Sequence, residues 1–557
     1  MKRIILPLCS LLLLTTPGHQ IQAQEQSATR TDSIRIDQAL RLIGLDFTWE
    51  EIRQMQRGVQ GNIAGYESIR NHPVPNDLSP SLYFDPLPPG YPVPPAEIKP
   101  KFTERQGVVK PQNPADLAFM TISELAWLMK NKQVTSMELT RLYLDRLKLF
   151  NDSLLCVVSL TEERALKQAA LADREIASGL YRGLLHGIPY GVKDLMAVPG
   201  YPTTWGAMPY LDQKLDMTAA VVERLDEAGA VLVAKLTTGA LAMGDVWYGG
   251  RTRNPWDMKQ GSSGSSAGPA AATAAGLVAF AIGTETLGSI VSPSTRCGVT
   301  GLRPTPGRVS KFGTMALSWS MDKIGPICRS AIDCAIVLDA IRGYDPRDPS
   351  TREAGFEFHS IPDLKSLRIG YLPDLFAQDY PYRINDSLAL EQFRKLGANL
   401  TPAELPGQFP VNAMRIILNA EAAAAFNDLT LSDRDSLLVS QTQGSWPNIF
   451  RTARLIPAVE YIQANRIRTA LIQAMNETMS HFDLIIVPTF GGNQLTLTNL
   501  TGHPCLLLPN GFDDSGHPTS ISLIGNLYRE GILCAVAGLY QEQTRNNLQK
   551  PPYFYKQ

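Results

Sequence analysis

Apolar and polar positions divide the chain into an N-terminal part with helical spacing and a longer part in which helices alternate with strands. Ten prolines between residues 72 and 100 favour an extended connector over a helix there. We expect residues 24–112 to form an extension that wraps the main body, the alternative being a structureless linker to a small helical domain. The apolar positions that recur at steps of four, three and four before the prolines, and so share one helix face, are Ile36, Leu40, Ile43 and Phe47.

From residue 113 onward, short apolar runs follow amphipathic stretches. Strands separated by helices are typical of a layered α/β domain. Residues 380–480 carry mostly helical patterns, and no fixed-period repeat indicates a solenoid. Helices are predicted at residues 136–150, 162–178 and 221–228, and strands at residues 187–193, 231–235, 277–282, 367–372, 484–487 and 504–508.

The first 23 residues have the pattern of a secretory signal peptide. Lys2 and Arg3 give a basic start, an apolar run follows at residues 4–14, and Ala23 is a plausible cleavage point before Gln24. The apolar run is too short to span a bilayer easily; an uncleaved membrane anchor is the alternative. The signal pattern predicts an exported protein, periplasmic or extracellular. No later segment has 18 uninterrupted apolar residues, so we expect no stable membrane insertion.

The amino-acid composition and net charge limit the kinds of binding partner to expect. Apolar residues make up 44% of the 557 residues and charged residues 19%, which is ordinary for a globular protein. The formal net charge of -1 gives no electrostatic reason to expect nucleic acid or an anionic membrane as partner. Cys9 leaves with the signal, and the other six cysteines are too few for a disulfide scaffold and lack zinc-site spacing. Buried free thiols are therefore expected.

Two polar, glycine-bearing turns carry the candidate chemistry. Residues 260–268, QGSSGSSAG, lead into a predicted helix that Pro269 opens and Gly276 ends. A second turn at residues 283–289, GTETLGS, follows a buried strand. Such turns present backbone N–H groups and hydroxyls to an anion. The glycine spacing matches neither phosphate-loop nor dinucleotide motifs, and composition alone leaves a purely structural turn as the alternative.

Five short segments, in order over residues 115–550, resemble the amidase signature family of serine hydrolases. Each is weak alone, but the ordered set is specific. The resemblance implies one α/β/α domain at residues 113–557 with a large, mixed, twisted central sheet, and residues 380–480 as a helical region that shapes substrate access. The segments are GVKD (191–194), RNPWD (253–257), GSSAG (264–268), GTETLGSI (283–290) and CGVTGLRPT (297–305).

The resemblance assigns a catalytic triad. It implies Ser289 as nucleophile, Ser265 as proton relay and Lys193 as base. The family's two serines lie 24 residues apart, which selects Ser265 over Ser262. A lysine can act as a base only when neutral, so burial must lower its pKa from about 10.4. The resemblance also implies a cis peptide before Ser265. The oxyanion hole that it implies consists of the backbone N–H groups of Thr286, Leu287, Gly288 and Ser289.

Some positions depart from the common family pattern. Leu287 stands where many members have glycine, and Val291 where many have arginine. A positive φ at residue 287 would strain the turn. We expect Met243 and Gly244 to line the substrate side of the cleft. Other nearby polar residues, for which structural roles are favoured, are Asp194, His186 and His503.

We therefore predict an exported amidase that hydrolyses a carboxamide C–N bond through an acyl-enzyme. The substrate is a small-molecule or peptide amide, and no metal or organic cofactor is implied. One alternative is an amidotransferase A-type subunit that releases ammonia for tRNA-dependent transamidation; another is a non-catalytic binding protein on the same scaffold. A homodimer stays open.

Overall fold

The structure is a computed structural model that describes residues 32–70, 76, 82, 84–103, 105–361 and 363–555. The predicted signal peptide lies outside the described residues. The chain divides into two compact units, with the boundary between Pro75 and Asn76 and a short stretch, Leu455–Pro457, grouped with the first. Across the described residues, no helix combines the length and apolar character needed to cross a bilayer.

The first unit contains a helix at residues 32–42 and the helix α2 (Trp49–Arg70). The first helix ends before Gly44, whose φ of +74° lies in the left-handed region that glycine adopts freely. Phe47 therefore lies beyond the predicted helix face, in the connection before α2. The α2 helix begins with a reciprocal cap, because the Thr48 N–H donates to the Glu51 carboxylate and the Glu51 N–H donates to the Thr48 hydroxyl.

In the described part of the second unit, eleven strands form one mixed sheet, in the order β1-β3-β2-β8-β10-β9-β14-β15-β13-β11-β12. Two further pairs of short strands, β4–β5 and β6–β7, lie outside it. The strands are β1 (Val157–Leu160), β2 (Pro189–Lys193), β3 (Val231–Leu236), β4 (Val246–Trp247), β5 (Gly250–Arg251), β6 (Arg253–Asn254), β7 (Asp257–Gly261), β8 (Phe280–Glu285), β9 (Thr300–Arg303), β10 (Lys323–Cys328), β11 (Ile369–Tyr371), β12 (Leu400–Pro402), β13 (Leu484–Pro488), β14 (Cys505–Phe512) and β15 (Pro518–Gly525).

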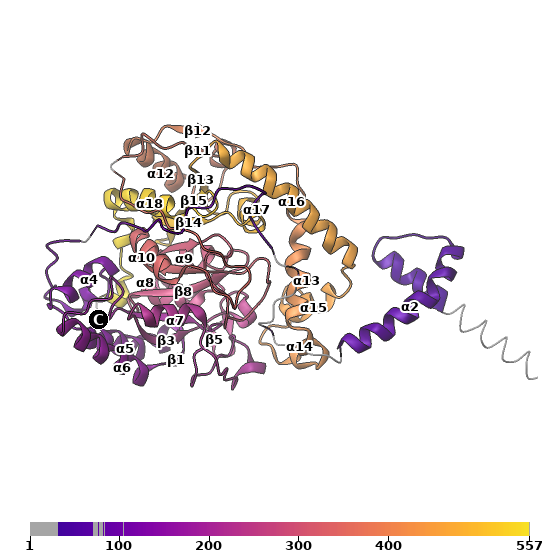
Figure 1. Cartoon of the computed structure of the whole chain (residues 1–557), viewed down its shortest axis with the longest axis horizontal. Helices are drawn as coiled ribbons and strands as arrows, with labels where there is room; N and C mark the ends of the chain where they lie inside the picture. The colour runs from indigo at the N-terminus through magenta and orange to yellow at the C-terminus, as the bar shows by residue number, and fades with distance from the viewer. Residues whose placement is uncertain are drawn as a thin grey trace, which may run out of the picture. The chain divides into compact units, whose positions relative to one another are not determined.

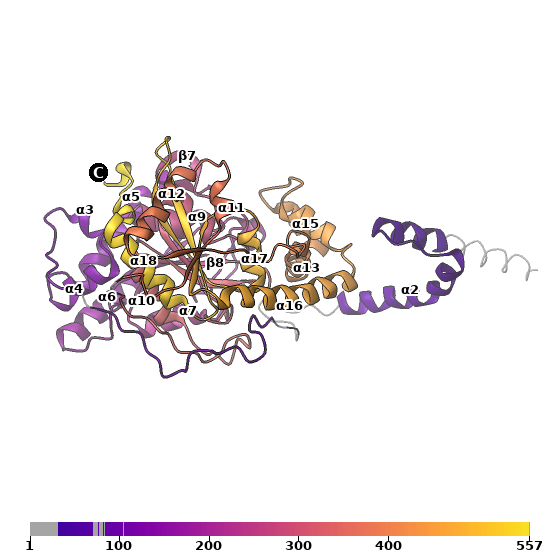
Figure 2. The same cartoon turned by 90° about the horizontal axis from the view of Figure 1, so that it is seen from above.

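The second unit also contains helices, most of which pack around this sheet (Figures 1 and 2). They are α3 (Pro114–Leu117), α4 (Ile122–Lys130), α5 (Ser136–Leu154), α6 (Glu162–Ala177), α7 (Ala220–Glu227), α8 (Ala267–Ala274), α9 (Val291–Cys297), α10 (Ala331–Ile341), α11 (Pro373–Ala377), α12 (Arg383–Lys395), α13 (Ile416–Ala425), α14 (Asn427–Leu431), α15 (Trp446–Ala453), α16 (Ala458–Ser480), α17 (Gln494–Thr501), α18 (Glu530–Thr544) and α19 (Pro552–Tyr555). Short 3₁₀ turns are η1 (Met208–Tyr210), η2 (Ala240–Ala242), η3 (Ala413–Arg415), η4 (Arg434–Leu437) and η5 (Asn546–Leu548).

Four neighbouring strands, β3, β2, β8 and β10, form a continuous part of the sheet. β2 runs parallel to both β3 and β8, and β8 pairs antiparallel with β10. Every residue of these four strands is buried. Strands with side chains buried on both faces require cover on both faces, which the surrounding helices supply. The predicted α/β/α fold with a mixed central sheet is confirmed.

Individual elements follow the sequence pattern with local shifts. The predicted strand at residues 277–282 moves to Phe280–Glu285, because Gly276 ends α8 at a φ of +65° and the chain turns before it joins β2. The predicted helix at residues 136–150 continues to Leu154. Residues 84–100 of the proline-rich segment belong to the second unit, in which the carbonyls of Pro94 and Ile98 accept from the N–H groups of Gly355 and Phe356.

Candidate active site

Strand neighbours bring the two candidate turns together. Lys193 is the last residue of β2, and Val192 lies opposite Ile282 in the parallel pairing with β8. The carboxyl ends of parallel strands meet at one edge of a sheet. Lys193 therefore lies beside Thr284, just before the turn that carries Ser289. The N–H of Ser266 donates to the Ser289 carbonyl at 3.1 Å, which joins the start of α8 to this turn.

Lys193 is fully buried among hydroxyl groups. Its Nζ lies 2.8 Å from Ser265 Oγ, 2.8 Å from Thr284 Oγ1 and 3.1 Å from Ser266 Oγ. The Ser266 hydroxyl donates to the Thr284 carbonyl and accepts from the Thr284 N–H, so toward Lys193 it acts as an acceptor. Burial lowers the pKa of Lys193 well below its usual value, against the smaller opposing effects of Asp322 and Glu285. The lowered pKa favours the neutral amine, which is the form that a base requires.

This lowered pKa predicts the pH dependence of the reaction. The neutral amine accepts a proton and the ammonium cannot, so kcat/KM should fall as the pH drops through the pKa of Lys193. The acid limb should lie far below the pH of about 10.4 at which an exposed lysine titrates. A pH series of kcat/KM, with stability checked at each pH, measures this limb. Activity that rises only near pH 10 would contradict a buried neutral base.

Ser265 and Ser262 are sorted by their contacts. The Gly264–Ser265 peptide is cis, and Ser265 Oγ faces Lys193. The Ser262 hydroxyl instead donates to the Ser263 carbonyl at 3.0 Å and does not contact Lys193. Ser289 is 8% exposed, and its hydroxyl forms no hydrogen bond to the described residues. The structure therefore places Lys193 and Ser265 in contact, with the Ser289 hydroxyl free to meet a substrate carbonyl.

The turn before Ser289 leaves backbone donors available. Its left-handed residue is Gly288, with a φ of +87°, whereas Leu287 has no positive φ. Leucine at position 287, where many family members have glycine, therefore does not strain the turn through a positive φ. Among the described residues, the N–H groups of Leu287, Gly288 and Ser289 donate no hydrogen bond, while those of Ile290 and Val291 donate to Glu285. Adjacent free N–H groups beside a serine hydroxyl are suited to a developing oxyanion.

Glu285 anchors the turn that carries Ser289. It is fully buried and accepts from Arg303, Asn499, Ile290 and Val291 at 2.9–3.0 Å. Burial alone would raise the pKa of Glu285, but the charges of Arg303 and Lys323 outweigh it and lower the pKa to about 2. The carboxylate of Glu285 is therefore ionised at neutral pH, and its hydrogen bonds connect the sheet with α17 and the start of α9.

Removing this charge should unfold the protein more readily. Glu285→Gln leaves the buried Arg303 guanidinium without its counter-ion, and breaking such a pair costs about 3–5 kcal/mol. The free energy of unfolding from urea titration measures this loss. Glu162→Gln is the matched control, since Glu162 pairs with Lys148 at the surface, where about 0–1 kcal/mol is expected. Equal stability of the two variants would contradict the anchoring role.

The remaining predicted residues lie around the triad. Gly244 packs on the loop that carries Ser265, because a Cβ at Gly264 would lie 1.9 Å from the Gly244 carbonyl oxygen. Met243, the residue before Gly244, is partly buried. Asp194 pairs with Lys235 at 2.8 Å and accepts from Thr204, contacts that are structural.

The histidines and cysteines are also placed. The ring of His503 is buried beside Thr501, and burial lowers the pKa of His503 to about 3, which keeps it neutral. His186 contacts Glu175. The six cysteines of the described residues are free and buried. Within those residues, no group of three or more His, Cys, Asp or Glu side chains could hold a metal ion.

A cavity adjoins the Lys193 end of the triad. Thr284 and Thr286 line it together with Ala242, and so do the buried Asp322 and Lys323. Ser289 is not part of its wall. Thr284, Ser266 and Lys323 were not singled out from the sequence. Thr284 and Ser266 lie inside two of the segments that carry the resemblance, so polar side chains close to the predicted serines were the available signal.

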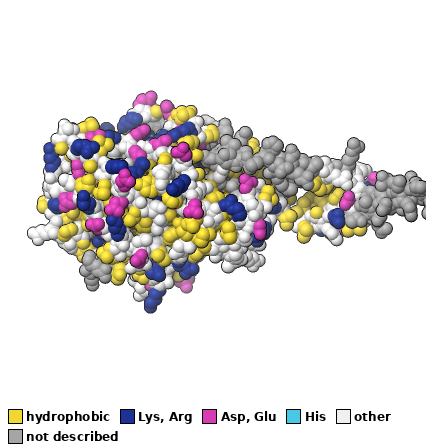
Figure 3. Space-filling view, turned by 90° about the horizontal axis from the view of Figure 1, so that it is seen from below, with side chains coloured by type: hydrophobic (Ala, Val, Ile, Leu, Met, Phe, Trp, Pro, Cys, Tyr) yellow, Lys and Arg dark blue, Asp and Glu magenta, His cyan; other side chains and the backbone are white. Residues whose placement is uncertain are grey.

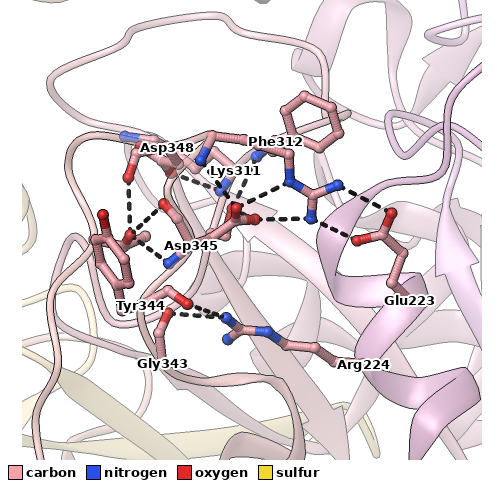
Figure 4. Close-up of polar contacts among 11 residues, drawn as sticks. Glu223, Arg224, Lys311, Phe312, Gly343, Tyr344, Asp345 and Asp348 are labelled. Carbon is pink, nitrogen blue, oxygen red and sulfur yellow. Dashed lines mark hydrogen bonds and ion pairs between the residues drawn. The ribbon is translucent and has the colours of Figure 1, made fainter.

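Another part of this cavity wall is fixed by ion pairs. Arg347 bridges Glu223 of α7 and Asp345, and its guanidinium carbon lies 4.1 Å from the centroid of the Phe312 ring. Figure 4 shows Glu223 and Asp345 facing the same guanidinium. The Lys311 N–H donates to Asp348 at 2.7 Å. These contacts tie the loop after α10 to α7 and give the cavity a rigid side.

Comparisons with known proteins agree with this geometry. The sequence profile of the Amidase family matches residues 138–497. The A-type subunit of the glutamyl-tRNA(Gln) amidotransferase of Moorella thermoacetica is 31% identical over 482 residues, covering 78% of this chain and 99% of that protein. The peptide amidase of Stenotrophomonas maltophilia superposes with a TM-score of 0.70 at 31% identity, covering 79% of this chain and 100% of its own. A structure of the peptide amidase PAM with the competitive inhibitor chymostatin is 30% identical, covering 76% of this chain and 98% of its own, with a TM-score of 0.68. This chain is therefore a member of the amidase family, the amidase signature enzymes.

Proposed function

We propose that this chain hydrolyses a carboxamide, with Ser289 as nucleophile, Ser265 as proton relay and Lys193 as base. The observation that carries the proposal is the buried Lys193 amine, whose pKa is lowered, 2.8 Å from the Ser265 hydroxyl. A lysine is costly to bury inside a sheet, and the contact of the Lys193 amine with the Ser265 hydroxyl supports a role as base.

The steps follow from this arrangement. Ser289 Oγ attacks the amide carbon while its proton passes to Ser265 Oγ and the Ser265 proton passes to Lys193 Nζ. The N–H groups of the turn at residues 286–289 stabilise the oxyanion. The proton returns through Ser265 to the leaving nitrogen, which departs as ammonia or an amine and leaves an ester on Ser289. Water, deprotonated along the same relay, attacks this ester and releases the carboxylic acid.

A substrate panel tests the proposal. Purified protein would be incubated with peptide C-terminal amides, aryl amides, fatty amides, glutamine and the corresponding esters. Peptide amides come first because the similar Stenotrophomonas maltophilia protein is a peptide amidase. We expect hydrolysis of at least one amide and labelling of Ser289 by a fluorophosphonate. Well-folded protein that neither labels nor hydrolyses any amide would favour a binding protein on this scaffold.

The second candidate is an amidotransferase A-type subunit. The likeness to the glutamyl-tRNA(Gln) amidotransferases supports it, since the A-type subunit from Moorella thermoacetica is 31% identical and matched over 99% of its length. Such a role predicts glutamine as the amide donor and activity that depends on a partner protein. Amide turnover by the isolated chain, unchanged by cell extract, favours the hydrolase. Stable co-purification with a tRNA-binding partner favours the amidotransferase.

We also propose that the chain is exported. The basic start, apolar run and Ala23 at residues 1–23 support this, and so does the shortness of the run. On the face shown in Figure 3, basic and acidic side chains are interspersed, which suits a protein without a polyanionic partner. N-terminal sequencing after expression in a secreting host should find Gln24 first. An intact Met1 in the cytoplasmic fraction would refute export.

A further inference from the structure

A strained turn lies in the segment that packs against the loop carrying Ser265. Leu241 and Ala242 have φ values of 49° and 62°, so two successive side-chain-bearing residues adopt the left-handed conformation. L-residues avoid this region, and they remain there only when their surroundings enforce it. The positions are not glycines, so the enforcement must come from contacts outside the turn.

The turn is continuous with the segment that packs on the catalytic loop. Residues 239–245, the buttress loop, end with Gly244 and Asp245, and the Gly244 carbonyl oxygen occupies the space where a Cβ at Gly264 would lie. Asp245 Oδ2 accepts from the N–H of Ser263 at 3.0 Å. A shift in the buttress loop would therefore be transmitted to the residues immediately before Ser265.

Trp446 supplies the enforcing contact. Its indole Nε1 donates to the Leu241 carbonyl at 2.9 Å, and the side chain is 6% exposed. The indole stacks on Phe450 of the same helix, α15, with ring centroids 5.1 Å apart and an angle of 12° between the planes. The N–H of Leu241 donates to the Trp205 carbonyl. Both peptide groups of Leu241 are thus held, one of them from the helical region at residues 380–480.

We propose that Trp446 is a positioning residue for catalysis: its indole N–H holds the strained buttress loop in the conformation that places Ser265 against Lys193. This inference rests on the proposed hydrolase function. It gives the helical region a part in the acyl-transfer step, beyond shaping access to the site. The loss of the indole N–H should therefore lower kcat and leave KM nearly unchanged, whereas a loosened substrate wall would raise KM.

The experiment compares Trp446→Phe with Trp247→Phe. Trp247 is 7% exposed, and its indole N–H has no hydrogen-bond partner among the described residues, so the control removes an equally buried indole without breaking such a bond. We expect Trp446→Phe to lower kcat and the rate of Ser289 labelling by about tenfold, the effect of a hydrogen bond of ordinary strength, with KM within about twofold. Trp247→Phe should keep both rates within about twofold.

A second variant tests the strain directly. Ala242→Gly makes the left-handed conformation inexpensive at residue 242, so adding it to Trp446→Phe should restore part of the lost rate. Unchanged kcat in Trp446→Phe, a change in KM alone, or equal losses in both tryptophan variants would each overturn the inference while wild-type labelling upholds the proposed function. Wild-type protein that fails to label would overturn both.

Discussion

Ser289→Ala should abolish amide turnover and fluorophosphonate labelling while the protein stays folded. Without the Oγ no acyl-enzyme can form, and losing a serine nucleophile costs about 10⁴- to 10⁶-fold in rate. The backbone donors of the turn survive the change, so weak residual turnover above the uncatalysed rate is expected. The Ser289 hydroxyl forms no hydrogen bond to the described residues. Its loss should therefore shift the free energy of unfolding by no more than about 0.5 kcal/mol.

The measurement is turnover of the best amide in the panel, with the fraction of labelled protein determined by intact mass. Ser262→Ala is the control, because Ser262 lies in the same Gly/Ser-rich segment but contacts Ser263 and not Lys193. It should keep Ser289 labelling. Turnover by Ser289→Ala at the wild-type rate would remove the nucleophile assignment, and complete loss in Ser262→Ala would reopen the choice between the two serines.

The candidate site residues could be named from the sequence because five short segments resemble those of the amidase signature family, whereas composition alone left a purely structural turn as the alternative. Lys193 ends a predicted strand, the two serines lie in glycine-bearing turns, and the structure brings Lys193 to Ser265 within 2.8 Å. A lowered pKa of Lys193 was expected from the role that the resemblance implies, and burial lowers this pKa in the structure. The contact between Lys193 and Ser265 joins segments 72 residues apart, so it depends on the folded sheet.

What could not be predicted depends on contacts between distant segments. Glu285 is tied to Arg303 and Asn499, which lie on β9 and α17, and Lys323 reaches Asn499 from β10 at 2.7 Å. Apolar periodicity predicts that a strand exists, but it carries no information about which strands are neighbours. The contact between Trp446 and Leu241 spans 205 residues and involves a backbone conformation that the residue types do not favour. Such features emerge only from the folded structure.

Lys193→Met should separate catalysis from stability. Methionine matches the length of the lysine stem and keeps the site apolar, but it has no lone pair to take the Ser265 proton. A fall of at least about 10³-fold in amide turnover and in Ser289 labelling is expected. In the wild type, folding lowers the proton affinity of Lys193, because burial makes its pKa lower in the folded than in the unfolded chain. This difference opposes folding below the unfolded-state pKa, and the opposition weakens as the pH rises. Replacing the lysine removes this cost, which offsets the lost hydrogen bonds to the neighbouring hydroxyls.

Lys235→Met provides the contrast, since Lys235 is equally buried one strand away on β3. Its amine is ion-paired with Asp194 at 2.8 Å, so its removal strands a buried carboxylate and should cost about 3–5 kcal/mol in unfolding free energy. The folded fraction of Lys235→Met should still label at Ser289. The two variants should then differ in opposite ways: Lys193→Met is inactive but stable, and Lys235→Met is active but unstable. The labelling rate and the urea midpoint, measured for both variants, test this contrast. Wild-type turnover by Lys193→Met would mean that another group takes the proton, because no neutral amine would remain beside Ser265.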